Sequence, residues 1–376
     1  MTRIGKENQK SVFIREPTHF KKGQFMLQQT ITAITPLDEK SMAAARDRQA
    51  ELTKPAGSLG RLETLSIQLA GITGRLDPPL TERAVIVAAG DHGVTAEGVS
   101  AYPAAVTPQM VLNFLNGGAA INVLARQAGA RVVVLDAGVA ADPFLSHPHL
   151  ISHKIGLGTA NFTQGPAMTR DQAVEAVEAG IAAVAREYER GLHLVGTGDM
   201  GIGNTTPSSA ICAVLTKTSV TEVTGRGTGI DEATRRHKIA VIERALAVNR
   251  PDPNDALDVL AKVGGFEIGA IAGIILGAAA RRIPVLVDGF ISTAGALLAA
   301  GLAPLSRHYM LAAHRSVEPG HRLMQEHLDL QPIFQLDLRL GEGTGAALAM
   351  PVVASAMAIL NEMATFSSAN VSQKEG

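Results

Sequence analysis

The feature that most constrains the fold is a series of short apolar runs, each followed by a turn rich in glycine or in polar and charged residues. The runs are apolar throughout rather than at every second residue, which is typical of strands buried on both faces of a parallel sheet. Six such runs occur, at 84–89, 131–135, 192–195, 284–287, 309–313 and 334–340. They predict a sheet whose strands are joined by crossover segments.

Helix-like stretches separate these runs, at 108–127, 169–190, 232–248 and 266–281. The second begins at Thr169, an N-cap residue, with glutamine at the fourth position of a capping box. Strands that alternate with helices predict an α/β fold, a parallel sheet with helices on both faces. The carboxyl ends of its strands line the ligand crevice, so we expect the turns after the runs to converge.

The two ends of the chain differ from this pattern. Residues 37–80 read as helices interrupted by a Gly/Pro-containing segment at 54–60, and 346–364 read as one long apolar helix. We therefore expect an α/β catalytic domain at 83–345 and a small helical lobe formed by 26–82 and 346–367. Residues 1–25 carry six Lys/Arg against two Asp/Glu and are expected to form a disordered extension, with Met26 as a domain start. Residues 368–376 are polar and are expected to fray.

Composition excludes several classes of function. The net charge is −1 and aromatic residues make up 3%, which disfavours nucleic-acid binding by charge or by stacking. The longest apolar stretch considered, 268–280, is too short to span a membrane. The one cysteine, Cys212, lies in an apolar run, so it predicts buried packing and no disulfide framework. We expect a cytoplasmic protein.

A carboxylate between two glycines is the first candidate for chemistry. A short run ends in Gly341-Glu342-Gly343, and an Ala-rich helical stretch follows. Glycines let the backbone turn tightly and approach a ligand closely. Glu342 is therefore either a helix cap in an exposed turn or a general base at a strand end.

A phosphate site is the second candidate. The turn 201–206, Gly-Ile-Gly-Asn-Thr-Thr, offers backbone N–H groups and hydroxyls, and its alternative is an ordinary tight turn. It satisfies neither the dinucleotide-binding nor the Walker pattern. A second glycine-rich loop, 224–231, precedes a helix with Lys238, which either reaches back to a phosphate or belongs to a solvated charged face.

Other polar groups at strand ends leave more options open. Asp91 and His92 lie side by side, but no compact ligand spacing accompanies them or Asp136, Asp199, Asp288 and His314, so we expect no metal. The segment 316–321 reads as a polar crevice loop or as a capped helix start. No nucleophile elbow is present. A dehydrogenase and a nucleotide-binding regulator are the competing classes, and the missing dinucleotide fingerprint argues against the first.

Taken together, these segments resemble the nicotinate-nucleotide–dimethylbenzimidazole phosphoribosyltransferase family. They occur in the family's order, from about residue 30 to residue 360. The matching segments are 52–63 (LTKPAGSLGRLE), 90–94 (GDHGV), 201–206 (GIGNTT), 225–229 (GRGTG), 287–290 (VDGF) and 340–345 (LGEGTG).

The resemblance implies a Rossmann-like large domain, a helical lobe from both chain ends, and a homodimer. It implies transfer of phosphoribose from nicotinate mononucleotide to 5,6-dimethylbenzimidazole, with inversion at C1′ and no cofactor or metal. Glu342 would be the general base, and Asp199 stands where the family usually has glutamate. The residues expected to bind substrate are Asp91, His92, Asp199, Gly201, Gly203, Asn204, Thr205, Lys238, Asp288, Ser316, Gly341, Gly343 and Thr344.

Overall fold

The computed structural model describes residues 22–372, apart from 143 and 228. Most of the expected N-terminal extension, residues 1–21, lies outside the described residues, as do 373–376 at the other end. Residues 22–25 belong to the first helix, α1 (Lys22–Ala33), so the expected boundary at residue 25 falls within a helix.

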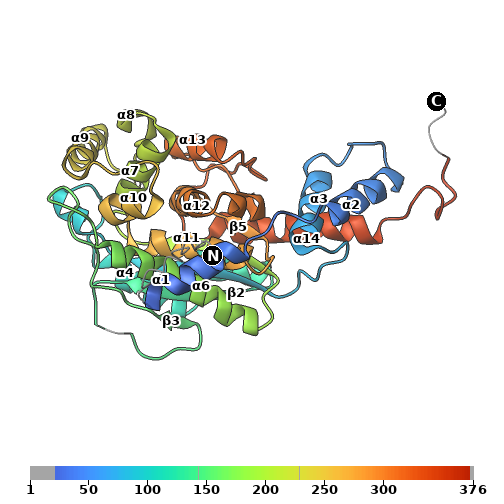
Figure 1. Ribbon diagram of the computed structural model, residues 1–376, viewed down its shortest axis with the longest axis horizontal. Coiled ribbons are helices and arrows are strands. Elements are labelled where there is room, and N and C mark those ends of the chain that lie inside the picture. Colours follow the sequence, from blue (N-terminus) through green and yellow to red (C-terminus); the bar gives the residue numbers. More distant parts are fainter. Residues whose placement is uncertain (1–21, 143, 228, 373–376) are drawn as a thin grey trace, which may run out of the picture.

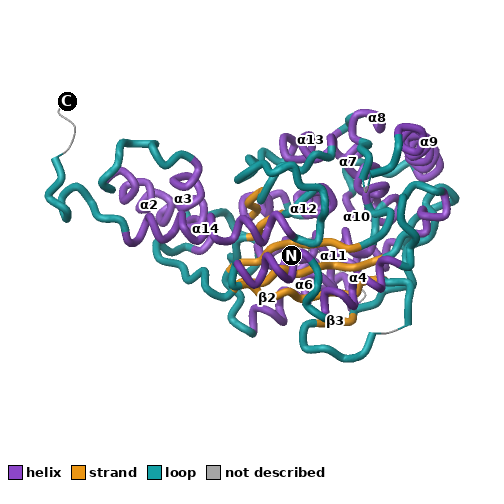
Figure 2. The backbone as a smooth tube through the Cα atoms, turned by 180° about the vertical axis from the view of Figure 1, so that it is seen from behind, coloured by secondary structure: helices purple, strands orange, loops and turns teal. Residues whose placement is uncertain are grey.

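Six parallel strands form one sheet, in the order β3-β2-β1-β4-β5-β6. Figure 2 shows the strands in orange, with helices around them. The strand order reverses direction between β1 and β4, and such a switch point is where an open α/β sheet binds its ligand. This confirms the predicted α/β class and the Rossmann-like arrangement. The strands are β1 (Arg83–Gly90), β2 (Ala130–Gly138), β3 (Leu150–Ser152), β4 (Leu194–Met200), β5 (Val285–Val287) and β6 (Met310–Ala312).

One strand was assigned wrongly from sequence. Residues 334–340 form no strand, and only Phe334 makes an isolated bridge, to His314 beyond β6. The run alternates polar and apolar residues, and Asp337 has a left-handed φ of 53°, which breaks an extended conformation. The strand that sequence did not predict is the short β3, which pairs with β2 at Val134 to Asp136.

Helices cover both faces of the sheet. The expected helix at 108–127 is two helices, because the chain turns at Gly117, where φ is 77°. The capping box predicted at Thr169 is present, with Gln172 as its partner. The helical elements after α1 are α2 (Glu39–Glu51), α3 (Arg61–Thr73), the 3-10 helix η1 (Gly93–Glu97), α4 (Val106–Leu115), α5 (Ala120–Gln127), α6 (Arg170–Glu189), α7 (Thr205–Thr216), α8 (Val220–Val223), α9 (Glu232–Asn249), α10 (Ala256–Val263), α11 (Phe266–Ala279), α12 (Phe290–Leu302), the 3-10 helix η2 (Pro304–Tyr309), α13 (Pro319–His327) and α14 (Thr344–Glu362).

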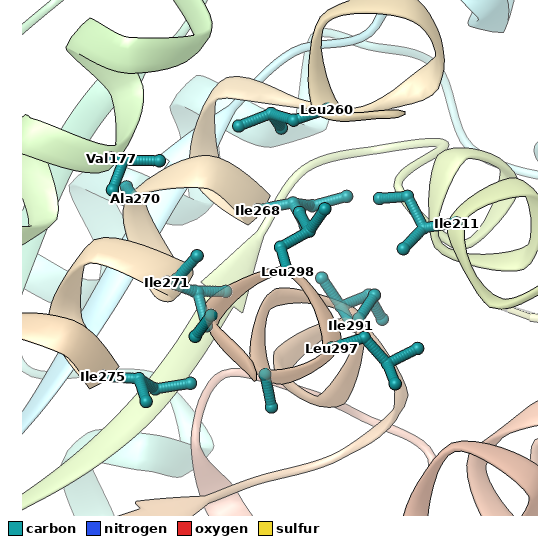
Figure 3. Packing of buried hydrophobic residues seen from close by; sticks show 14 of the residues in the cluster. Val177, Ile211, Leu260, Ile268, Ala270, Ile271, Ile275, Ile291, Leu297 and Leu298 are labelled. Carbon is teal, nitrogen blue, oxygen red and sulfur yellow. The ribbon is translucent and has the colours of Figure 1, made fainter. Parts of the chain in front are cut away.

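Two apolar cores lie on opposite faces of the sheet, because successive side chains of a strand point to opposite sides. On β1, Ile86 joins the core beneath α6, α11 and α12, and Val85 and Val87 join the core beneath α3 and α14. Figure 3 shows side chains of the first core, among them Val177, Ile268 and Leu298. Helices α6 and α11 approach closely there: a Cβ on Gly180 would lie 1.9 Å from the carbonyl oxygen of Ala270.

The small lobe consists of α2, α3 and the second half of α14, and it projects from the sheet domain (Figure 1). The C-terminal segment closes it, where the amide of Phe366 donates to the carbonyl of Glu51. Helix α1 departs from the expected division. It packs on α6 of the large domain, and the amide of Leu27 donates to the Glu178 carboxylate at 2.9 Å.

By length and composition, α14 is the one helix among the described residues that could cross a membrane. More than half of that stretch is buried inside the protein, against α3, α5 and β4. Its apolar side chains therefore pack in the second core, beneath α3 and α14. The first turn of this helix carries the site described next.

Candidate active site

The turn before α14 has an unusual backbone. Gly341, Glu342 and Gly343 have φ angles of 85°, 63° and 92°, so three consecutive residues are left-handed. A non-glycine residue in this region costs of order 1 kcal/mol or more and persists only where the surroundings hold it. The surroundings here are tight, since a Cβ on Gly343 would lie 2.4 Å from Cγ1 of Val85 on β1.

Asp288, just after β5, fixes this turn in place. Its carboxylate accepts from the amide of Gly343 at 3.2 Å and from the amide of Ala346 at 2.9 Å, which caps the N-terminus of α14. The side chain is fully buried, and burial raises its pKa. Asp288, expected from the resemblance to bind substrate, therefore positions the Glu342 turn and does not line the cavity described below.

The Glu342 carboxylate is nearly buried, with 6% of the residue exposed. One oxygen, Oε2, accepts from the amide of Ile121 at the start of α5, at 3.1 Å. Burial raises the pKa of Glu342, the Ile121 amide opposes the shift, and the charge of Asp288 adds to it. The other oxygen, Oε1, has no hydrogen bond within the described residues. A carboxylate with a raised pKa and a free oxygen is suited to accept a proton.

The turn 201–204 connects β4 to α7 and has the form of an anion site. Gly203 has a φ of 90°, and the N-terminus of α7 follows at Thr205. Lys238, on α9, donates from Nζ to Oγ1 of Thr205 at 2.6 Å. Lys238 is 1% exposed, and burial lowers its pKa to about 8 while the charge of Glu318 raises it. A buried ammonium thus lies at the first turn of α7.

Asp199 lies between the two turns. Its Oδ2 accepts from the side-chain amide of Asn204 at 3.0 Å, and its Oδ1 is buried without a partner. Burial, followed by the charge of Asp288, raises the pKa of Asp199 well above its usual range. The side chain also restricts position 341 to a small residue, because a Cβ on Gly341 would lie 3.0 Å from Oδ2 of Asp199. Asp199 thus links the anion turn to the Glu342 turn.

A cavity of about 60 Å³ opens between these elements. Five of the expected substrate-binding residues line it: Asp199, Asn204, Thr205, Ser316 and Gly341. Glu342 and Lys238 do not line it themselves, but Gly341 beside Glu342 and Thr205, which accepts from Lys238, do. Its remaining lining residues are Gly227, Gly289, Phe290, Ile291, His314, Glu318, Arg339 and Leu340. A larger cavity of about 540 Å³ adjoins it through Gly227, Glu318 and Arg339.

Two of these lining residues, Glu318 and Arg339, were not singled out from sequence. Burial raises the pKa of Glu318, and the charge of Lys238 opposes the shift. Arg339 donates from Nη1 to the carbonyl of Gly227 at 3.3 Å, which joins the segment 334–340 to the 224–231 loop. The only signal for Glu318 was its place in the polar segment 316–321, and the run around Arg339 was interpreted as a strand.

The expected residues Asp91 and His92 lie outside this cavity. Asp91 accepts from the amide of Ala140 at 2.8 Å, and the buried Nε2 of His92 lies 2.8 Å from Oε1 of Glu267. His92 packs against the turn 201–204, where a Cβ on Gly201 would lie 3.1 Å from its Nε2. Glu267 was missed, since it lies in a stretch that sequence predicted only as an apolar helix.

Of the remaining expected residues, Thr344 donates its hydroxyl to the carbonyl of Gly341 at 2.9 Å and so closes the Glu342 turn. Within residues 22–372, less the two undescribed positions, no group of three or more His, Cys, Asp or Glu side chains is arranged to hold a metal. The site therefore combines the buried Glu342 carboxylate, the Asp199 carboxyl group, and the turn 201–204 with Lys238, which together we call the anion corner.

Comparison with known proteins gives a consistent picture. The family model described as Phosphoribosyltransferase matches residues 34–371. Nicotinate-nucleotide–dimethylbenzimidazole phosphoribosyltransferases from Chloroflexus aggregans and Roseiflexus sp. are each 62% identical, over 93% of this chain and 99% of theirs. The crystal structure of the enzyme of that name from Thermus thermophilus is 49% identical with a TM-score of 0.85, covering 90% of this chain and all of that one. The chain is therefore a phosphoribosyltransferase, a pentosyl-transferring enzyme, and belongs to the nicotinate-nucleotide–dimethylbenzimidazole phosphoribosyltransferase family.

Proposed function

We propose that this enzyme transfers the phosphoribosyl group of nicotinate mononucleotide to 5,6-dimethylbenzimidazole. The products are α-ribazole 5′-phosphate and nicotinate, and the first supplies the lower ligand of cobalamin. The names of the relatives carry this substrate pair. The observation in this chain that best supports it is the Glu342 carboxylate, buried in a turn with one free oxygen and a raised pKa.

In the proposed reaction, one benzimidazole nitrogen attacks C1′ of the ribose as the C1′–N bond to nicotinate breaks. The electron pair of that bond goes to the pyridinium nitrogen, whose ring becomes neutral as it leaves. Attack from the opposite face inverts C1′ and gives the α-linkage. Because the leaving ring carries no new negative charge, the main demand on the enzyme is alignment, which can contribute several kcal/mol.

The proton balance assigns Glu342 its role. The acceptor carries a proton on its second ring nitrogen, and the product would be cationic if that proton stayed. Glu342 takes it as the first nitrogen attacks. Removing a general base commonly costs about 10²–10⁴-fold in rate.

The phosphate of the nucleotide is placed at the anion corner. The N-terminus of α7 favours an anion, and Lys238 adds a charge at Thr205. The amides of Ile202, Asn204 and Thr206 already have acceptors within the protein, so they are not counted among the donors. The charge of Glu318 partly offsets the effect of burial on the pKa of Lys238. Ser316 lines the same cavity as Thr205.

The test is nicotinate release from nicotinate mononucleotide on addition of dimethylbenzimidazole, followed by chromatography of the product. Glu342→Gln should reduce turnover by roughly 10²-fold or more and leave nucleotide affinity largely intact. Glu362→Gln, an exposed change at the far end of the same helix, is the matched control. Near-normal turnover of Glu342→Gln would exclude this residue as the base.

The homodimer implied by the resemblance is part of the proposal. Light scattering of the eluting protein should give twice the chain mass of 39.2 kDa. A monomer at working concentrations would contradict it.

A further inference from the structure

A cavity of about 540 Å³ lies at the β6 edge of the sheet. It is separate from the site described above, although its Arg315 is the chain neighbour of His314 and Ser316, which line that site. We call it the arginine pocket. It shares no lining residue with either cavity of the candidate active site. Its polar lining includes Arg61, Gln68, Arg307, His308, Arg315 and Gln325.

The three arginines come from different parts of the fold. Arg61 is the first residue of α3 in the small lobe, whereas Arg307 and Arg315 flank β6 in the large domain. Contacts across this junction already exist: Arg61 donates to the carbonyl of Gln331 at 3.3 Å, and Gln68 donates to the carbonyl of His308 at 3.0 Å. The pocket therefore lies where the small lobe meets the sheet edge.

The arginines lack counter-ions. Within the described part of the chain, none of the three forms an ion pair, and the Nε atoms of Arg61 and Arg315 are buried without a hydrogen-bond partner. Of the two acids on the rim, Glu326 is paired with Arg322 at 2.8 Å, which leaves Asp329. Burial lowers the pKa of Arg61, yet a guanidinium stays charged in proteins.

Another partly buried arginine, Arg131, does have acidic partners. Arg131 pairs with Glu82 at 2.7 Å and with Glu187 at 3.2 Å. Removing a charge from water without replacing its partners is unfavourable, so buried charges are normally paired. Arg61 and Arg315 are partly buried as well, and Arg61 donates to Thr64 and to the carbonyl of Gln331, but neither guanidinium has an acidic partner. Both side chains line the same cavity.

We propose that the arginine pocket binds the phosphate group of a small phosphorylated metabolite. Guanidinium groups present paired N–H donors that match phosphate oxygens, and a volume of this size is typical of small-molecule sites. Gln325 adds a buried Oε1 that has no donor, which suits a hydroxyl of the same molecule. The bound phosphate would join α3 to the β6 edge.

The proposal is tested by calorimetric titration of the full chain with ribose 5-phosphate, inorganic phosphate and acetate. The Lys238→Ala background removes the charged side chain of the proposed anion corner, which weakens phosphate binding there, and the arginine variants then report on binding in the arginine pocket. Arg315→Gln and Arg61→Gln are compared in this background with Arg46→Gln. Arg46 is half-exposed on α2, outside the pocket, and loses the same charge.

We expect both phosphates to bind, acetate to bind far more weakly, and each pocket variant to lose roughly tenfold or more in affinity. Arg46→Gln should retain the affinity. Absence of binding, equal losses in all three variants, or preference for acetate would overturn the proposal. If Arg61→Gln fails to fold, Arg307→Gln, an exposed residue of the same pocket, replaces it. Nicotinate release is assayed separately and does not bear on this result.

Discussion

Replacing Gly343 with alanine isolates the tertiary constraint that holds the Glu342 turn. Gly343 has a φ of 92°, and its Cβ would lie 2.4 Å from Cγ1 of Val85 and 3.0 Å from the carbonyl oxygen of Thr197. The left-handed backbone adds strain of about 1–2 kcal/mol to an alanine, and the close contacts of its Cβ add an overpacking cost of about 1–3 kcal/mol. Gly343→Ala should therefore lower the free energy of unfolding by roughly 2–5 kcal/mol.

The two costs can be separated, because only the contact with Val85 depends on a side chain. Val85→Ala removes Cγ1 and by itself should cost about 2 kcal/mol for the cavity it leaves. Gly343→Ala combined with Val85→Ala should be less destabilised than the sum of the two single changes, by at least about 0.5 kcal/mol. The backbone strain remains in the double variant.

Urea unfolding of the four proteins measures these differences, and nicotinate release measures the effect on the turn. Gly165→Ala is the control, because a Cβ there meets nothing within 4 Å. It should change the free energy of unfolding by no more than about 0.5 kcal/mol. If Gly343→Ala behaved like Gly165→Ala, or if the double variant were fully additive, steric confinement of the turn would be refuted.

Three further outcomes follow from the site. Turnover should fall as the pH drops through the pKa of Glu342, which lies above its usual 4.5, and Glu342→Gln should lose this dependence, as a pH–rate profile would show. Affinity for nicotinate mononucleotide should fall as the pH rises through about 8, where Lys238 loses its proton, and Lys238→Arg should remain flat in the same titration; an equal decline in both proteins would remove Lys238 from the anion corner. Glu267→Ala leaves His92 buried without its partner and should cost about 2 kcal/mol in urea unfolding, whereas a change below about 0.5 kcal/mol would show that the pair is not needed.

Local sequence patterns carried most of the fold. Apolar runs located β1, β2, β4, β5 and β6, because a strand covered on both faces must be apolar throughout. They failed for β3, in which only Leu150 of the three residues is buried, and for 334–340, where the left-handed Asp337 prevents pairing. Local patterns could not predict where α1 packs either, since Glu178, which accepts from Leu27 of α1, lies about 150 residues away in the sequence.

The site divides in the same way. The flanking glycines made Glu342 a candidate base, and the turn 201–206 and Lys238 were candidates for a phosphate site, while the residues alone left a helix cap, a tight turn and a solvated charged face as alternatives. The roles of Glu318, Arg339 and Glu267 depend on partners distant in sequence, and the free oxygen of Glu342 depends on Ile121 and Asp288.

The sequence by itself determined the class of fold, the order of most strands along the chain and the identity of the candidate base. These follow from local rules, in which apolar runs form buried strands and glycines permit left-handed turns. The tertiary structure alone decided which polar side chains share a cavity and how their pKa values shift, because burial and charge depend on neighbours brought together by folding. That is why Asp288, which follows a strand as the other polar candidates do, caps a helix, while Glu342 keeps an oxygen free for chemistry.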